Sequence, residues 1–439
     1  MTLENLKNIK IVTKPSNTLC LLCKAGRMLC GKPVCPILLR VGALLKHKEI
    51  FDLDVVEGSS PPGVFVGRFG YPKVNVGPLI PPYHGDTSIL DLPERWVGFS
   101  LDKILGFRSS LVWGRIPVKV EDARRGGRLI ELLQELAMSQ KPVDGEAILT
   151  KKPVGTVVFD SHAQPFGPSA PLKDFRFSDV KVEKHIEKCY YDYDLKAGEA
   201  VLRLYRAGVP VSKIQESLSL GMFGKLSNRK IVPTRWSITA VDNLISLSLL
   251  EEVKRYSVIS EYRVYVFRNL DNLFLAIFIP EAWSFEWIEA WFPGTVWNMG
   301  GGKPELMGDF EGFEGRKTYA DVGGCYYAAR LAVAEALKAE RKQATVLIFR
   351  EIYGGYVTPV GVWNVRESLR RALKTKPYIF QTFRDALKFA SLRLRIPLEE
   401  WVKVSVILRK ALFQKKLSEF LGVSKIKAYK LKQIFYILI

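Results

Sequence analysis

Four cysteines in a short amino-terminal stretch constrain folding more strongly than any other feature of this sequence. They are Cys20, Cys23, Cys30 and Cys35, in the string CLLCKAGRMLCGKPVC. A tetrahedral zinc ion takes four thiolate or imidazole ligands, and a two-residue gap lets both thiolates of the first pair reach one ion. Because all four positions are filled, we expect one structural zinc ion. Its binding would supply folding free energy that so short a segment cannot obtain from a core of its own.

Two other chemistries also use four cysteines. Disulfide bonds are uncommon in intracellular proteins outside hyperthermophiles, and iron–sulfur clusters take four thiolates as zinc does. We favour zinc because the cysteines form two close pairs around a glycine-containing knuckle, which suits a compact metal site. The remaining cysteines, Cys189 and Cys325, stand alone in the sequence and are predicted to be buried thiols.

Positive charge is concentrated at the two ends of the chain. The formal net charge is +20. Residues 1–50 hold nine Lys and Arg against two Asp and Glu, residues 360–439 hold eighteen against five, and the remainder is neutral overall. Concentrated positive charge favours a polyanionic partner, because binding releases condensed counterions. We therefore expect DNA or another nucleic acid as a partner. The alternative is a generally basic thermophile proteome, in which the charge implies no partner.

The composition indicates a globular chain without a membrane segment. Of its 439 residues 48% are hydrophobic and 25% charged, which suits about two to three folded domains. No stretch of about 18 uncharged apolar residues is present. The opening string MTLENLKNIK also lacks the apolar core of a signal peptide. We expect a soluble cytoplasmic protein that contacts no membrane.

Helical and strand-like patterns both occur, so the predicted fold class is α+β, a mixed helix and sheet protein of several domains. Apolar residues at helical spacing predict a helix over 125–140 and another that starts at Pro233. Short apolar runs joined by a turn-prone segment predict strands over 262–268 and 273–279. Residues 365–439 are predicted to be helical, with breaks at prolines.

These patterns divide the chain into four predicted parts. A small basic segment with the four-cysteine zinc finger comes first, and a basic helical tail comes last. Between them we predict a mixed α/β domain and then an α+β domain, with a boundary where the chain becomes mainly helical. The predicted parts are residues 1–50, 51–180, 181–360 and 361–439.

Several residues are candidates for contacts with phosphate or a nucleotide. Residues 58–83 hold too much Pro and Gly for a helix, and alternating valines predict two short strands around a turn that carries basic side chains. A phosphate-binding loop and a rigid surface hairpin both fit this stretch, and we slightly favour the hairpin because no ligand motif is complete. Arg108 and Ser109 could donate hydrogen bonds to phosphate, and they would equally fit a helix end. Arg235 is predicted in the first turn of one helix, and Gly323 and Gly324 at the start of another, where free amides could bind an anion. The candidates are Arg68, Lys73, Asn75, Arg108, Ser109, Arg235, Gly323 and Gly324.

A glycine-rich loop over 298–317 invites comparison with nucleotide-binding loops. It does not match the Walker A pattern, because Trp297 and Pro304 stand where glycine and Ser or Thr are required. It also lacks the strand-to-helix context of a dinucleotide fingerprint. Three of its acidic residues, Asp309, Glu311 and Glu314, would suit a divalent ion, but three acids in a glycine loop are usually solvated.

The carboxy-terminal region contains a segment with the pattern of a sliding-clamp (PCNA) interacting box. Residues 414–421 offer a Gln for a polar pocket and three apolar side chains on one helical turn for an apolar pocket. The box residues are Gln414, Leu417, Phe420 and Leu421. The second aromatic of the usual pattern is replaced by Leu421.

A helix-turn-helix motif explains the same segment differently. An apolar helix, a turn at Gly422 and a basic second helix would bury the apolar box residues in a small core. The lysines of the second helix would then face DNA phosphates. They are Lys425, Lys427, Lys430 and Lys432.

The chain resembles the archaeal Nre DNA-repair family along nearly its full length. The strings that carry the resemblance are C-x2-C-x6-C-G-x3-C-P, FVGRFGYPKVNVGPLIPP, HAQPFGPSAP, RKIVPTRWSITAVD and GRKTYADVGGCYYAARLAVAEAL. They begin at residues 20, 65, 162, 229 and 315. The resemblance implies a role in DNA-damage repair in an archaeal cell, at the nucleoid. It also implies a four-cysteine zinc finger at Cys20–Cys35 and a clamp-binding box at 414–421.

Two functions of different class follow. The favoured one is a repair factor that binds zinc, associates with DNA and is recruited by the sliding clamp. The alternative is an enzyme acting on nucleotides or nucleic acids, with a site built from Arg68, Lys73, Arg108, Arg235 and the 298–317 loop. No complete nuclease, transferase or hydrolase constellation is visible, so no catalytic residue is assigned. Assembly of the four basic residues in one pocket with an acid or His would favour the enzyme.

Overall fold

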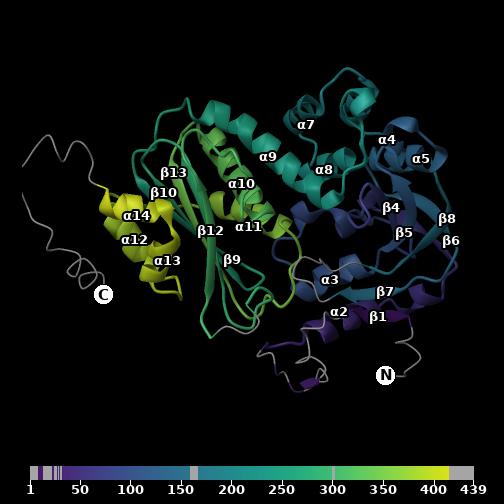
Figure 1. The fold of residues 1–439 in the computed structure, drawn as a ribbon, viewed down its shortest axis with the longest axis horizontal. Coiled ribbons are helices and arrows are strands. Elements are labelled where there is room, and N and C mark those ends of the chain that lie inside the picture. Colours follow the sequence, from purple (N-terminus) through teal and green to yellow (C-terminus); the bar gives the residue numbers. More distant parts are fainter. Residues whose placement is uncertain are drawn as a thin grey trace, which may run out of the picture.

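The described residues form two six-stranded sheets, a small two-stranded sheet and thirteen α-helices (Figure 1). The predicted α+β class is therefore confirmed. The structure is a computed structural model. It describes residues 8–12, 22–23, 27, 29, 32–158, 167–298 and 302–414.

The first sheet has the strand order β2-β6-β8-β5-β4-β3 and is antiparallel except between β5 and β8. Its strands are β2 (Val55–Ser60), β3 (Gly63–Val66), β4 (Lys73–Ile80), β5 (Val112–Lys119), β6 (Val143–Leu149) and β8 (Ser169–Phe177). Strands β3 and β4 form the hairpin predicted from the alternating valines, with Val66 opposite Val76. These valines are buried because one face of the hairpin packs into the core.

The second sheet has the order β12-β11-β13-β10-β9-β14. Its strands are β9 (Tyr262–Asn269), β10 (Asn272–Ile279), β11 (Ser284–Trp291), β12 (Glu305–Glu311), β13 (Thr345–Ile352) and β14 (Tyr378–Phe380). The two predicted strands are confirmed as β9 and β10, which pair as a hairpin. Every residue of β10 and β13 is buried, because helices cover both faces of this sheet.

Three helices cover each face of the second sheet (Figure 1). On the side toward the first sheet lie α9 (Thr234–Val253), α10 (Gly324–Glu340) and α11 (Trp363–Leu373). On the far side lie α12 (Phe383–Ser391), α13 (Leu398–Val404) and α14 (Val406–Phe413). Successive residues of β10 point to opposite faces of the sheet. Phe274 therefore packs on the side of α9, α10 and α11, and Leu275 on the side of α12, α13 and α14.

The remaining elements surround the first sheet. The parallel pair is β1 (Ile9–Val12) with β7 (Gly155–Val158). The other α-helices are α2 (Pro36–Leu45), α3 (Leu101–Ser109), α4 (Asp122–Arg125), α5 (Arg128–Ala137), α6 (Lys184–Tyr191), α7 (Ala197–Arg206) and α8 (Val211–Ser219). Short 3-10 turns are η2 (Lys48–Asp52), η3 (Ser88–Asp91), η4 (Pro93–Arg95) and η5 (Leu226–Asn228).

The helix predictions hold with one correction. The helix predicted over 125–140 is α5, and the one predicted to start at Pro233 is α9, which begins at Thr234. The region from residue 365 on, predicted to be helical with breaks near Pro377 and Pro397, also contains a strand at Tyr378–Phe380, directly after the first break. This segment forms β14 because the outer edge of β9 offers unpaired backbone groups that it can bond.

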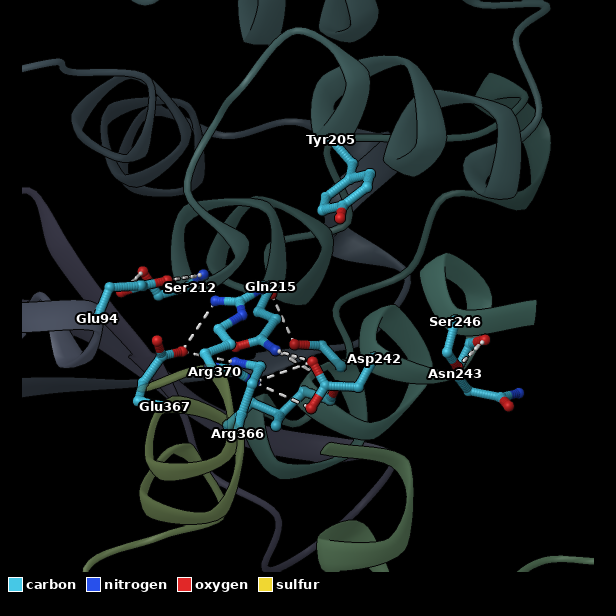
Figure 2. A network of polar contacts seen from close by, with 12 residues as sticks. Glu94, Tyr205, Ser212, Gln215, Asp242, Asn243, Ser246, Arg366, Glu367 and Arg370 are labelled. Atoms are coloured by element: carbon cyan, nitrogen blue, oxygen red, sulfur yellow. Dashed lines mark hydrogen bonds and ion pairs between the residues drawn. The ribbon is translucent and has the colours of Figure 1, made fainter. Parts of the chain in front are cut away.

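A buried ionic network joins the central helices (Figure 2). Nη1 of Arg366 on α11 donates to both carboxylate oxygens of Asp242 on α9, each at 2.9 Å. Nε2 of Gln215 on α8 donates to the same carboxylate at 2.9 Å. Both members of the ion pair are at most 1% exposed. The network therefore holds α8, α9 and α11 in a fixed arrangement.

The network extends to α10 and α7. Arg370 on α11 donates to Glu335 on α10 at 2.6 and 2.7 Å, and the Tyr205 hydroxyl donates to the same carboxylate at 2.9 Å. Each buried charge thus has an opposite charge and further hydrogen bonds, which offset the cost of removing it from water.

Removal of one partner from the central pair should destabilise the fold strongly. Arg366→Ala leaves the Asp242 carboxylate buried without its countercharge, and we expect a loss of about 3–5 kcal/mol in the free energy of unfolding. Chemical denaturation followed by circular dichroism measures this loss. The control is Lys403→Ala, which breaks the exposed Lys403–Glu400 pair and should cost less than about 1 kcal/mol. Equal effects of the two substitutions would contradict a structural role for the network.

Candidate nucleic-acid interface

The structure brings together the candidate residues of two sequence motifs. Arg68 lies in the loop between β3 and β4, and Lys73 and Asn75 lie at the start of β4. Arg235 lies in the first turn of α9. A hydrogen bond joins the two segments, because the Val66 amide donates to Oγ1 of Thr234 at 3.0 Å. Residues separated by more than 150 positions in the sequence therefore share one surface.

Exposed aromatic side chains lie between these basic residues. The rings of Tyr71 and Trp236 contact each other at a centroid distance of 5.2 Å, and each residue is 48% exposed. Phe69 is 79% exposed, and the Arg68 guanidinium lies 5.1 Å from the centre of its ring. We call this surface the aromatic–basic patch. It consists of Arg68, Phe69, Tyr71, Lys73, Arg235 and Trp236.

Backbone hydrogen bonds hold the loop that presents these rings. The Lys73 amide donates to the Gly70 carbonyl at 2.9 Å, and the Gly67 amide donates to the Asn75 carbonyl at 2.8 Å. Gly70 has a φ of 85°, and a Cβ at this position would lie 2.7 Å from the Lys73 carbonyl oxygen. Only glycine fits such a turn without strain. The exposed rings are thus held by an ordered backbone.

The charges of the patch favour an anion. Lys73 and Lys119 are direct partners in the β4–β5 ladder and both are exposed. Like charges placed opposite each other destabilise a sheet unless an anion lies near them. Aromatic faces beside cations are the combination that binds single-stranded nucleic acid, since bases stack on the rings and phosphates meet the cations. The patch can therefore hold an unpaired base together with its backbone.

Arg108 and Ser109 lie elsewhere, at the end of α3. Nη1 of Arg108 donates to Oδ1 of Asp91 at 2.6 Å, and both side chains are 19% exposed. The buried Ser109 hydroxyl donates to the Leu105 carbonyl of its own helix at 2.7 Å. The segment therefore forms the helix end that was the alternative to a phosphate site.

Gly323 and Gly324 also lie outside the patch, at the start of α10. Gly323 has a φ of 66°. A Cβ at Gly324 would lie 3.1 Å from Val362 and 3.3 Å from Oγ1 of Thr239. These glycines let α10 pack closely against α9 and the residues before α11. The four basic residues suggested for an enzyme are accordingly divided, because Arg108 lies in a half-buried ion pair and the others lie in the patch.

Two of the three acidic residues that suggested a divalent ion form ion pairs, and both lie on β12 rather than in a loop. Asp309 pairs with Arg316, and Glu311 pairs with Arg330 at 2.6 Å. Within the part of the chain that the structure describes, no group of three His, Cys, Asp or Glu side chains is arranged to hold a metal ion. Arg316 and Arg330 thus supply the positive charge that Asp309 and Glu311 would otherwise need from a divalent ion.

The predicted zinc and clamp sites fall largely outside the described residues. Cys23 and Cys35 are described and both are buried, whereas Cys20 and Cys30 lie outside. Gln414 is exposed directly after α14, and the other box residues and the lysines of the helix-turn-helix alternative lie outside. None of the helices in the described ranges is long and apolar enough to cross a bilayer.

The sequence patterns did not single out Phe69 and Trp236 as functional. The available signal was the close alternation of aromatic and basic residues in the strings RFGYPK and RW. An aromatic residue in one string is usually a core residue, so this signal is weak until the two strings are known to meet. Their contact through Tyr71 and Trp236 makes the pattern informative.

Comparisons with known proteins identify relatives over most of the chain. The family models described as archaeal Nre, N-terminal, and archaeal Nre, C-terminal, match residues 29–298 and 311–420. A protein of Archaeoglobus fulgidus named DNA repair protein NreB is 44% identical over 403 residues, which cover 92% of this chain and 100% of the relative. No solved structure matches the chain significantly.

Two further relatives carry the name DNA repair protein NreA. The protein from Archaeoglobus fulgidus is 38% identical and covers 87% of this chain and 95% of its own length. The protein from Haloferax volcanii is 35% identical and covers 78% of this chain and 84% of its own length.

Proposed function

Because this chain belongs to the archaeal Nre family, we propose that it is a DNA-repair factor that contacts DNA through the aromatic–basic patch. The names of its relatives support the repair role. The observation that carries the DNA contact is the exposed pair of Tyr71 and Trp236 with arginine and lysine beside it. The net charge of +20 adds a general attraction to polyanions.

The patch suits an unpaired or locally opened strand better than an intact duplex. Bases in a duplex are already stacked on each other and offer no free face to an aromatic side chain. Damaged or mispaired sites cost less to open, so a stacking surface favours them. Recognition of distorted DNA would thus need no base-specific hydrogen bond from the patch.

Removal of the Trp236 ring should weaken DNA binding. We expect Trp236→Ala to raise the Kd for a fluorescent single-stranded oligonucleotide by about tenfold, since stacking contributes about 1–3 kcal/mol per base. Fluorescence anisotropy at one fixed salt concentration measures this change. The matched control is Tyr378→Ala, because Tyr378 is a similarly exposed aromatic on β14, at 51%. An unchanged Kd for Trp236→Ala, or an equal loss in both variants, would overturn the proposed interface.

We also propose that the chain binds one structural zinc ion through Cys20, Cys23, Cys30 and Cys35. The four-cysteine spacing supports this proposal, and so does the burial of both described cysteines of the set. The ion would fold the amino-terminal segment and leave no open coordination position for chemistry.

Loss of one predicted ligand should release the metal. We expect Cys20→Ser to lower the bound zinc below one ion per chain and to lower the melting temperature of the amino-terminal segment. Native mass spectrometry of the full chain counts the metal, with Cys189→Ser as the control because Cys189 is a buried thiol within another core. Equal zinc content in all three proteins would contradict the assignment.

We further propose that residues 414–421 dock on the sliding clamp. The sequence pattern of Gln414, Leu417, Phe420 and Leu421 supports this docking, and Gln414 is exposed where α14 ends. Tethering to the clamp would raise the local concentration of the protein on DNA without a new base contact.

A single substitution separates clamp docking from the helix-turn-helix alternative. We expect Phe420→Ala to reduce clamp capture in a pull-down by about tenfold without changing the melting temperature, since one buried apolar anchor contributes roughly 1.5–3 kcal/mol. A chain truncated before Gln414 should lose capture completely. Leu392→Ala, which removes an apolar side chain that is 76% exposed, is the control. A lower melting temperature with unchanged capture would instead support the helix-turn-helix motif.

A further inference from the structure

A cavity of about 360 Å³ lies between strand β3, the end of α3 and helix α8. Ion-pair residues and apolar residues from separate elements line it. The ion-pair residues are Asp91, Arg108, Lys213 and Glu216. Its apolar wall includes Pro62, Val64 and Ile238. The volume lies within the range of small-molecule sites in proteins, and an apolar wall with a few converging polar groups is typical of them.

Two cation–carboxylate pairs converge on this cavity. Arg108 and Asp91 approach to 2.6 Å, and Lys213 and Glu216 approach to 3.3 Å. Less than a fifth of each of the four side chains is exposed. Nζ of Lys213 also donates to the Pro62 carbonyl at 3.1 Å, and Glu216 accepts a hydrogen bond from the Val64 amide. Backbone contacts therefore hold these side chains in place beside the cavity.

Burial also changes the proton affinity of the carboxyl groups. Desolvation raises the pKa of Glu216 to about 7, although Lys213 opposes the shift. Desolvation likewise raises the pKa of Asp91 against the effect of Arg108. A carboxyl group with such a pKa can either donate or accept a hydrogen bond near neutral pH. The cavity thus offers both donors and acceptors to a ligand.

The charge balance of the lining indicates a neutral ligand. Besides the two pairs, the lining includes Lys141 and Glu183, so basic and acidic side chains are equal in number. A phosphate would place its negative charge beside three acidic side chains, which disfavours it. A flat heteroaromatic ring with donors and acceptors on its edge fits better, because the apolar wall can cover its faces.

The cavity adjoins the aromatic–basic patch. Thr234 lines the cavity and directly precedes Arg235 and Trp236 of the patch. Phe65 also lines the cavity, three residues before Arg68. The hydrogen bond between Val66 and Thr234 joins these two walls. A strand held on the patch would therefore lie close to the cavity.

We propose that this cavity binds a single nucleobase, turned out of a DNA strand that the aromatic–basic patch holds. The ion-paired residues around Glu216 would form hydrogen bonds to the edge of the base, and the apolar wall would cover its faces. This inference rests on the proposed function, because the patch would supply the strand. It assigns a binding role to Lys213 and Glu216 that the patch alone does not require.

Binding of free deoxynucleosides to the full chain tests the cavity without DNA. The probes are the four deoxynucleosides, titrated one at a time and followed by ligand-observed NMR, with inorganic phosphate as competitor. We expect at least one deoxynucleoside to bind and phosphate not to displace it. Glu216→Ala should weaken this binding by about tenfold, as expected for a lost hydrogen bond to the base. Ile238→Trp, which fills the cavity and keeps every charge, should abolish it.

The control is Glu251→Ala, which removes an exposed carboxylate near the far end of α9 and should change nothing. Absence of binding by all four deoxynucleosides, displacement by phosphate, or unchanged binding in Ile238→Trp would overturn the inference. DNA affinity measured on the same samples separates the two proposals. DNA binding without deoxynucleoside binding removes only the cavity assignment, whereas deoxynucleoside binding without DNA binding removes the proposed interface and supports the cavity.

Discussion

The buried contact between Asp242 and Arg366 (Figure 2) positions both the aromatic–basic patch and the cavity. Asp242 lies on α9, whose first turn carries Arg235 and Trp236. Its third hydrogen bond comes from Gln215 on α8, the helix that also carries Lys213 and Glu216. The Asp242 carboxylate thus links α9, which carries part of the patch, to α8, which lines the cavity. Arg366 fixes the same carboxylate from α11. Separation of these helices would leave charges buried without partners, which is strongly unfavourable.

The two sites use ionic groups in different ways. On the patch, Lys73 and Arg235 are exposed and Arg68 is half-buried, all beside aromatic rings, so they can meet an anionic backbone while the rings stack on bases. In the cavity, each cation is paired with a carboxylate, so the lining is balanced and offers hydrogen bonds rather than net charge. A strand and its base require these two environments side by side. The β3–β4 hairpin and the start of α9 contribute to both.

Local patterns predicted the secondary structure well where one face of an element is buried. The valines of the β3–β4 hairpin, the leucines of α5 and Pro233 before α9 each report a short-range preference, and the structure confirms all three. The strand β14 was missed because its pairing partner β9 is more than a hundred residues away. A three-residue strand has too little pattern of its own to be distinguished from a break between helices.

The sequence by itself determined the family, the α+β class and the uneven distribution of charge, because motifs, periodicity and composition are local properties. It also identified Arg68, Lys73 and Arg235 as candidates without showing which of them meet. Only the tertiary structure decided that Tyr71 contacts Trp236 and that Arg108 pairs with Asp91 beside a cavity. Such contacts depend on how α8, α9 and the first sheet pack, and packing is set by long-range burial and pairing of charges.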